Sequence, residues 1–145
     1  MIEKEIETIF ARQDSGCDVD IDGVLKAFER LRSIATEADL PTLVAAIKSP
    51  RNNFWTRELF AEPICQLGGV DYLEPLLDAV QLNLEAGHDN DSLNISLTEL
   101  AYAEPQKCRT KLKALLAGAD FRHREAASWL LKFCETDELD GKGYG

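Results

Sequence analysis

The chain has 145 residues, 45% of them hydrophobic, which is enough for one compact domain with one core. Its formal net charge is −10, and ten acidic residues lie between Glu58 and Gln106, a stretch that contains no Lys or Arg. Because such a stretch repels phosphate and attracts basic protein surfaces, nucleic acid is excluded as its expected partner.

Membrane and disulfide classes are also disfavoured. No run of about 18 apolar residues is present, and the first ten residues, MIEKEIETIF, carry three glutamates where a secretory signal would be basic and then apolar. The four cysteines, Cys17, Cys65, Cys108 and Cys134, include no C-x-x-C pair. We therefore expect a cytoplasmic protein with reduced thiols that does not bind membranes.

Apolar residues recur three and four positions apart along almost the whole chain, which predicts an all-α protein. A first helix is expected over about 1–12, stopped by Asp14-Ser15-Gly16. Asp22 is expected to cap a second helix that runs to about residue 38. A third helix follows from about Asp39 to Ser49.

The stretch DVDIDGVLKAFE, before and within the second helix, matches a calcium-loop pattern. Its side-chain ligands would be Asp18, Asp20, Asp22 and Glu29. A calcium loop requires an entering helix that reaches the first ligand, and Asp14-Ser15-Gly16 interrupts the chain there. We therefore expect no metal and no cofactor, with a weak calcium loop as the alternative.

A fourth helix is predicted over about 54–67, with Pro63 inside it and Gly68-Gly69 suited to a left-handed end. Asp71, with Glu74 three residues later, is expected to cap a fifth helix that Gly87 terminates.

The sixth helix should start at Asp91 or Ser92, and Pro105 should begin a seventh that Gly118 ends. Asp120 is expected to cap an eighth helix through Cys134, with Trp129 in the core. Residues 136–145 have little to bury and are predicted to form a flexible tail.

These helices form pairs that resemble one another at a spacing of roughly 33 to 39 residues, which is typical of an α-solenoid. The segment DFRHREAASWLL, Asp120 to Leu131, resembles the second helix of HEAT-like repeats. The resemblance implies a single-domain short α-solenoid of about four helical hairpins over residues 1–135. Residues 1–38 would be a capping pair and 39–135 three degenerate repeats. It also implies that Asp120 and Arg124 form a polar ladder between repeats.

No catalytic motif is present, and His88 and His123 lie in different predicted units. A Cys-His pair brought together by folding is still possible, because spatial adjacency is not visible in sequence. We expect no catalytic residues and no enzyme activity.

A small acidic HEAT-like protein without catalytic groups resembles bacterial immunity proteins that neutralise toxins delivered between competing bacteria. The resemblance implies a protein partner, a basic toxin domain of nuclease type. A scaffold or assembly factor that holds another protein in its groove is the alternative, and the oligomeric state stays open. The candidate partner-binding residues are the acids of the second helices and of the turn before the sixth helix, with one aromatic residue: Glu58, Glu62, Asp89, Asp91, Glu99 and Trp55.

Overall fold

The structure is a computed structural model that describes residues 2–13, 20–118 and 123–144, with side chains described as far as Cys134. Every regular element in these ranges is helical, so the prediction of an all-α protein is confirmed. The α-helices are α1 (Glu3–Gln13), α2 (Ile21–Ile34), α3 (Leu40–Ile47), α4 (Phe54–Gly68), α5 (Leu73–Glu85), α6 (Asp91–Ala103), α7 (Pro105–Ala117) and α8 (Arg124–Tyr144). Short 3-10 turns, η1 (Glu37–Asp39) and η2 (Gly69–Tyr72), precede α3 and α5.

The cap of α2 differs from the predicted one. Asp20, not Asp22, precedes the helix, and its Oδ1 accepts a hydrogen bond from the Gly23 N–H at 3.0 Å. A Cβ atom on Gly23 would lie 2.4 Å from Asp20 Oδ2, so the glycine leaves room for the capping carboxylate. Asp22 is exposed in the first turn of the helix instead.

The end of α4 follows the predicted glycine pattern, but the start of α5 does not. Gly69 has a φ of +63°, a conformation that a residue with a Cβ adopts only with strain. Asp71 lies inside η2, and α5 begins two residues later without a side-chain cap. Asp71 therefore does not cap α5, because the 3-10 turn leads the chain into that helix.

The last helix is longer than predicted. Asp120, its expected cap, lies outside the described residues, and α8 continues as far as Tyr144. Most of the segment 136–145 is therefore helical in backbone, whereas its flexibility stays a prediction. Arg124 donates to the backbone oxygens of Leu116 and Gly118 at 2.7 and 2.6 Å, so it closes the turn between α7 and α8 within one helical pair.

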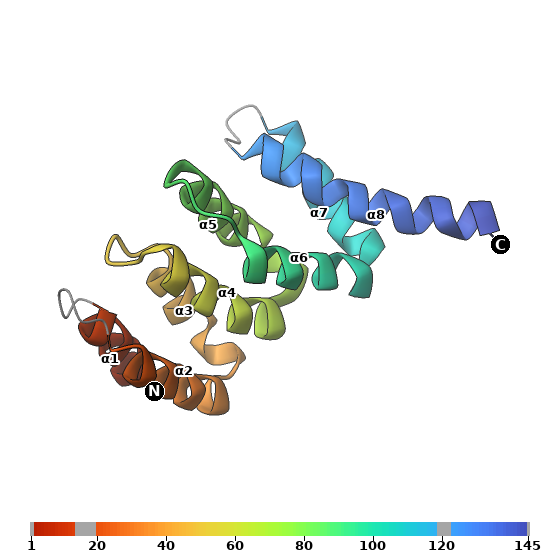
Figure 1. Ribbon diagram of the computed structural model, residues 1–145. Helices are drawn as coiled ribbons and strands as arrows, with labels where there is room; N and C mark the ends of the chain where they lie inside the picture. Colours follow the sequence, from red (N-terminus) through yellow and green to blue (C-terminus); the bar gives the residue numbers. More distant parts are fainter. Residues whose placement is uncertain (1, 14–19, 119–122, 145) are drawn as a thin grey trace.

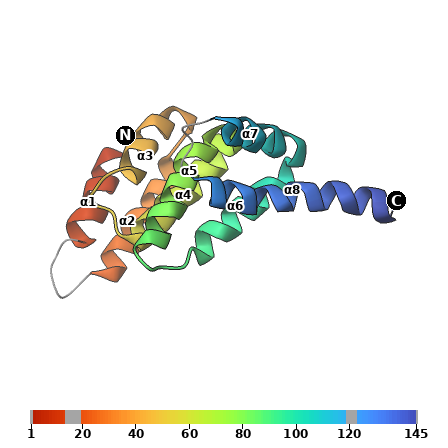
Figure 2. The same cartoon turned by 90° about the horizontal axis from the view of Figure 1, so that it is seen from above.

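Three pairs of successive helices pack on each other, whereas α5 and α6 meet mainly at the connection between them. α1 packs on α2, α3 on α4 and α7 on α8, while α4, α6 and α8 lie side by side (Figure 1). Figure 2 shows α3, α5 and α7 on the opposite side of the stack from α6. The molecule thus has two helical layers, and one of them presents α4, α6 and α8 together.

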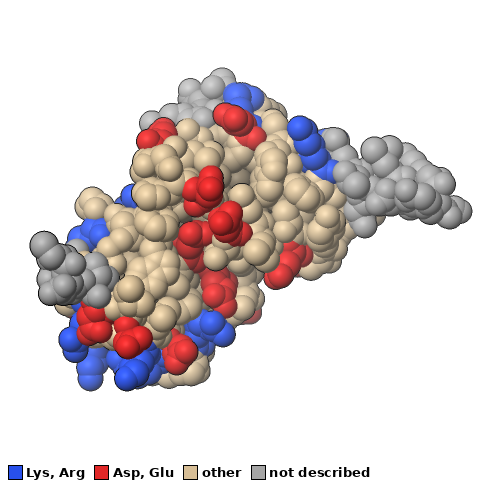
Figure 3. Space-filling model, in the orientation of Figure 1, with Lys and Arg blue, Asp and Glu red and all other residues tan. Residues whose placement is uncertain are grey.

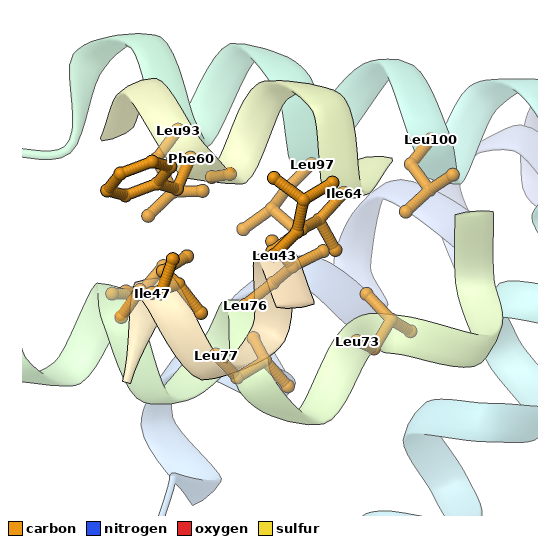
Figure 4. Packing of buried hydrophobic residues seen from close by; sticks show 14 of the residues in the cluster. Leu43, Ile47, Phe60, Ile64, Leu73, Leu76, Leu77, Leu93, Leu97 and Leu100 are labelled. Carbon is orange, nitrogen blue, oxygen red and sulfur yellow. The ribbon is translucent and has the colours of Figure 1, made fainter. Parts of the chain in front are cut away.

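One continuous hydrophobic cluster joins the layers, from Ile2 in the first pair to Cys134 in the last. Leucine side chains of α3, α5 and α6 point toward Phe60 and Ile64 of α4 in its centre (Figure 4). Trp129, predicted to be core, is partly exposed and packs on the edge of the cluster. It lines a depression of about 210 Å³ together with Leu84 of α5 and Asn94 of α6, so these helices cover it only in part.

Candidate functional site

A groove runs between α4 and α6, and we call it the α4–α6 groove. Its volume is about 390 Å³. It is lined by Glu62, Cys65 and Gln66 from α4 and by Ile95, Ser96, Glu99, Leu100 and Ala103 from α6. Two of the predicted binding residues, Glu62 and Glu99, therefore line the same depression from different helices.

Two long-range contacts set the register of the helices that form the groove. The Phe54 ring, at the start of α4, stacks on His88 just before α6, with centroids 3.9 Å apart. One turn further along, the Glu58 carboxylate accepts a hydrogen bond from the Leu93 N–H at 3.0 Å. Both contacts join the first two turns of α4 to residues at, or just before, the first turn of α6. The two helices therefore run in the same direction.

Beneath this contact, a buried amide network fixes the connection between α5 and α6. Arg57 Nη1 donates to Asn83 Oδ1 at 2.9 Å, and Asn83 Nδ2 donates to Asn90 Oδ1 at 2.9 Å. Asn90 Nδ2 in turn donates to the Val80 carbonyl at 3.2 Å. Buried amides are costly unless hydrogen-bonded, so this chain of bonds holds the connection in place.

Negative charge shapes the chemistry of the groove. Burial, together with the nearby carboxylates of Glu62 and Glu99, raises the pKa of the Cys65 thiol to about 12. Cys65 is therefore a neutral thiol and not a nucleophile at neutral pH. Glu62 also accepts from Arg32 of α2 at 3.2 Å, which places one cation of the chain itself at the edge of the groove.

The structure separates the other candidate residues. Glu58 is partly buried and holds the start of α6, so its carboxylate is committed to the fold. Asp89 and Asp91 are exposed at the start of α6, at the end of the groove away from Glu99. Trp55 is partly buried against the core and lines a different pocket with Gln13 and Ile21. Only Glu62 and Glu99 of the predicted set come together at the groove.

Sequence reasoning missed two exposed apolar side chains on α6. Ile95 is 59% exposed and Tyr102 is 56% exposed. The Tyr102 ring meets Phe133 of α8 edge-on at 6.0 Å, and Phe133 meets Trp129 edge-on at 5.0 Å. The signal was available, because both residues fall off the buried stripe of Leu93, Leu97 and Leu100.

Acidic side chains gather over α4, α6 and the connection before α6, along the middle of the face in Figure 3. The bases Lys107, Lys111 and Lys113 are on α7, which belongs to the other layer. The acids of α4, α6 and the connection before α6 thus share one layer, whereas Asp71, Glu74, Asp78 and Glu85 of the same stretch lie on η2 and α5.

A second depression, of about 330 Å³, contains Asp78 of α5 in direct contact with His123, the residue before α8. Its described lining residues, which also include Lys48 and Glu85, contain no Ser, Thr or Cys that could act as a nucleophile. His88 stacks on Phe54 and lies apart from this pair. Within the described ranges, no three His, Cys, Asp or Glu side chains are grouped as metal ligands would be.

The alternative calcium loop is tested only in part. Asp18 lies outside the described residues, Asp20 caps α2 and pairs with Arg12 at 3.1 Å, and Glu29 is exposed on the helix. The calcium alternative accordingly stays a prediction.

Among the described helices, none combines the length and apolar character that crossing a membrane requires. Compared with models of protein families, with curated proteins and with solved structures, the chain matches none.

Proposed function

We propose that this chain is a non-catalytic protein-binding module with the architecture of a short HEAT-like α-solenoid. The stacked helical pairs and the continuous core across them support that architecture. Arg57 supports it as well, because its bond to Asn83 links one helical pair to the next. The module binds a basic protein on the layer that presents α4, α6 and α8.

The observation that carries the proposal is the position of Glu62 and Glu99. They come from different helices and line one groove, within a stretch of chain that has ten acids and no bases. The bases of α7 lie in the other layer, and Arg32 at the edge of the groove is paired with Glu62, so the described residues that line the groove with Glu99 are acidic or uncharged. Fast, salt-sensitive association is the expected result.

Within that class, we propose an immunity protein that neutralises a bacterial toxin of nuclease type. A nuclease carries a basic surface for its substrate, and an acidic inhibitor covers that surface by mimicking the substrate's charge. The resemblance of the sequence to HEAT-like repeats is compatible with this role, because such stacks present extended binding surfaces.

The test uses a basic nuclease domain encoded beside the gene for this chain, with binding followed by stopped-flow fluorescence and by nuclease inhibition. Glu62→Gln with Glu99→Gln should slow association about tenfold at low salt and flatten its salt dependence. The matched control is Glu74→Gln with Glu85→Gln, which removes two exposed carboxylates from α5. Glu58 is left unchanged, because it holds α6.

Equal slowing by the control pair, or loss of binding only when Lys111 and Lys113 are replaced, would show that another surface binds. Binding without inhibition of the nuclease would favour the scaffold or assembly role instead.

A further inference from the structure

Two arginines of this chain occupy the same kind of setting. Arg51 Nη1 pairs with Glu7 at 2.8 Å while its guanidinium lies over the Phe10 ring, 4.8 Å from the centroid. Arg32 pairs with Glu62 at 3.2 Å while it lies over the Phe28 ring at 5.6 Å. In each case a carboxylate and an aromatic ring hold one guanidinium between them, an arrangement that satisfies both its charge and its planar face.

In the first of these two sites, the carboxylate and the ring that hold the arginine both belong to α1. Glu7 and Phe10 are three residues apart on α1, so their side chains are neighbours on one face of the helix. The arginine they hold comes from outside the helix, from the segment between α3 and α4.

The same spacing recurs on α6 without an arginine. Glu99 and Tyr102 are three residues apart, both are exposed, and Glu99 makes no ion pair with any described residue. The ring of Tyr102 is in edge contact with Phe133 of α8. Glu99 and Tyr102 thus match the residue types and the spacing of the Arg51 site, and a guanidinium would have to come from the partner.

Ile95 extends this pair into a surface for more than one side chain. It lies four residues before Glu99 and seven before Tyr102, on the same face of α6, and it is 59% exposed. An apolar side chain beside the incoming arginine would cover it. Across the groove lies Glu62, whose carboxylate is already paired with Arg32.

We propose that Glu99 and Tyr102 form a receptor for an arginine of the partner protein, with Ile95 packing on an apolar residue next to that arginine. This rests on the proposed function for the kind of partner, a basic protein, and adds which side chain of the partner is recognised. Arginine is selected over lysine, because a guanidinium can pair with Glu99 through its edge while its face stacks on Tyr102.

The experiment titrates the isotope-labelled chain with the acetylated and amidated peptide Ala-Leu-Arg-Leu-Ala and follows the backbone amides by NMR. Shifts should be concentrated on residues 95–103 and should saturate. The same peptide with lysine should bind at least about fivefold more weakly, since it loses the stacking contribution. The peptide with citrulline, which keeps the shape and loses the charge, should produce no saturable shifts.

Variants separate the contributions. Glu99→Gln and Tyr102→Ala should each lower the affinity for the arginine peptide at least about fivefold. Tyr102→Phe keeps the ring and should bind this peptide with the affinity of the parent protein. Both positions are exposed, and the amide spectrum of each variant reports that the fold is intact. Glu74→Gln on α5 is the matched control and should leave the affinity unchanged.

The inference is wrong if arginine and lysine peptides bind alike, if neither causes shifts on α6 at millimolar concentration, or if Tyr102→Ala has no effect. A nuclease that still depends on Glu62 and Glu99 would then leave the proposed function standing. Conversely, selective binding of the arginine peptide without binding to any basic nuclease would support the receptor and contradict the immunity role.

Discussion

Asn83 is a fully buried amide among the leucines of α5, and each of its polar atoms has a partner. It accepts from Arg57 and donates to Asn90 and to the Phe54 carbonyl. Asn83→Leu should lower the free energy of unfolding by about 3 kcal/mol, because it leaves the buried groups of Arg57 and Asn90 unpaired. Urea denaturation measures this loss.

Gln106→Leu, an exposed amide on α7, is the control for Asn83→Leu and should change stability by less than about 0.5 kcal/mol. A loss below about 1 kcal/mol for Asn83→Leu would mean that the network contributes little.

The thiols provide a second prediction at the scale of the residue. Burial raises the pKa of Cys65 from about 9 to about 12, and burial likewise raises the pKa of Cys108. In a Cys17→Ser background, the native protein should react with an aromatic disulfide reagent far more slowly at pH 8 than the unfolded protein does. Rapid reaction of the native protein would contradict this assignment.

The same shift has a consequence for stability. A thiol whose pKa is higher in the folded than in the unfolded state makes its full contribution to stability below about pH 9. That contribution falls as the pH rises from about 9 toward about 12. Cys65→Ala should therefore flatten the alkaline loss of stability, measured as the urea midpoint between pH 8 and pH 11.

At the scale of the element, the cap of α2 predicts that Gly23→Ala changes from destabilising to stabilising when Asp20 is replaced. Gly23→Ala should destabilise the parent protein by about 1 kcal/mol, because the added Cβ collides with the Asp20 carboxylate and breaks the cap. In an Asp20→Ala background the collision is gone, and Gly23→Ala should stabilise by about 1 kcal/mol through helix propensity. Additive effects in the double-mutant cycle would contradict the contact.

Calcium should have little effect on the same element. Because Asp20 caps α2 and the helix already includes Asp22 and Gly23, millimolar calcium should leave the Tm and the helicity nearly unchanged. A rise of several degrees that Glu29→Ala abolishes would establish the calcium loop.

Local signals explain which elements were predictable. Asn53, Pro105 and the glycines after α4 and α7 act within a few residues of a helix end, so the limits of α4 and α7 follow from sequence. Asp20 and Asp22 have the same chemistry two residues apart, so the sequence alone does not show which of them caps α2. Only the room at Gly23 distinguishes them.

Long-range contacts explain what was not predictable in the site. The bond from Leu93 to Glu58 spans 35 residues, so nothing near Glu58 in the sequence shows that its carboxylate is already used. Glu62 and Glu99 could be selected as acids of second helices, but their shared groove depends on the parallel packing of α4 and α6.

At the scale of the whole molecule, the continuous core predicts one cooperative transition. Trp55 reports on α4 and Trp129 on α8, near the other end of the stack. In the single-tryptophan variants Trp129→Phe and Trp55→Phe, the fluorescence midpoint should coincide with that of far-UV circular dichroism within each protein. Separate midpoints would divide the stack into independently melting parts.

The parallel course of α4 and α6 has an electrical consequence. Peptide dipoles of parallel helices point the same way, so both carboxyl-terminal ends carry partial negative charge at the same end of the groove. Neither helix has a basic residue in its last turn, and Lys107 of α7 lies 3.7 Å from the carboxylate of Glu104, the residue that ends α6. Glu99 lies in the half of α6 nearest this end, whereas Asp89 and Asp91 lie at the opposite, partly positive end. Because this effect acts only near the helix ends, a cation is favoured near Glu99 and disfavoured near Asp89 and Asp91, so removing the two aspartates should slow its binding less than removing Glu99 alone.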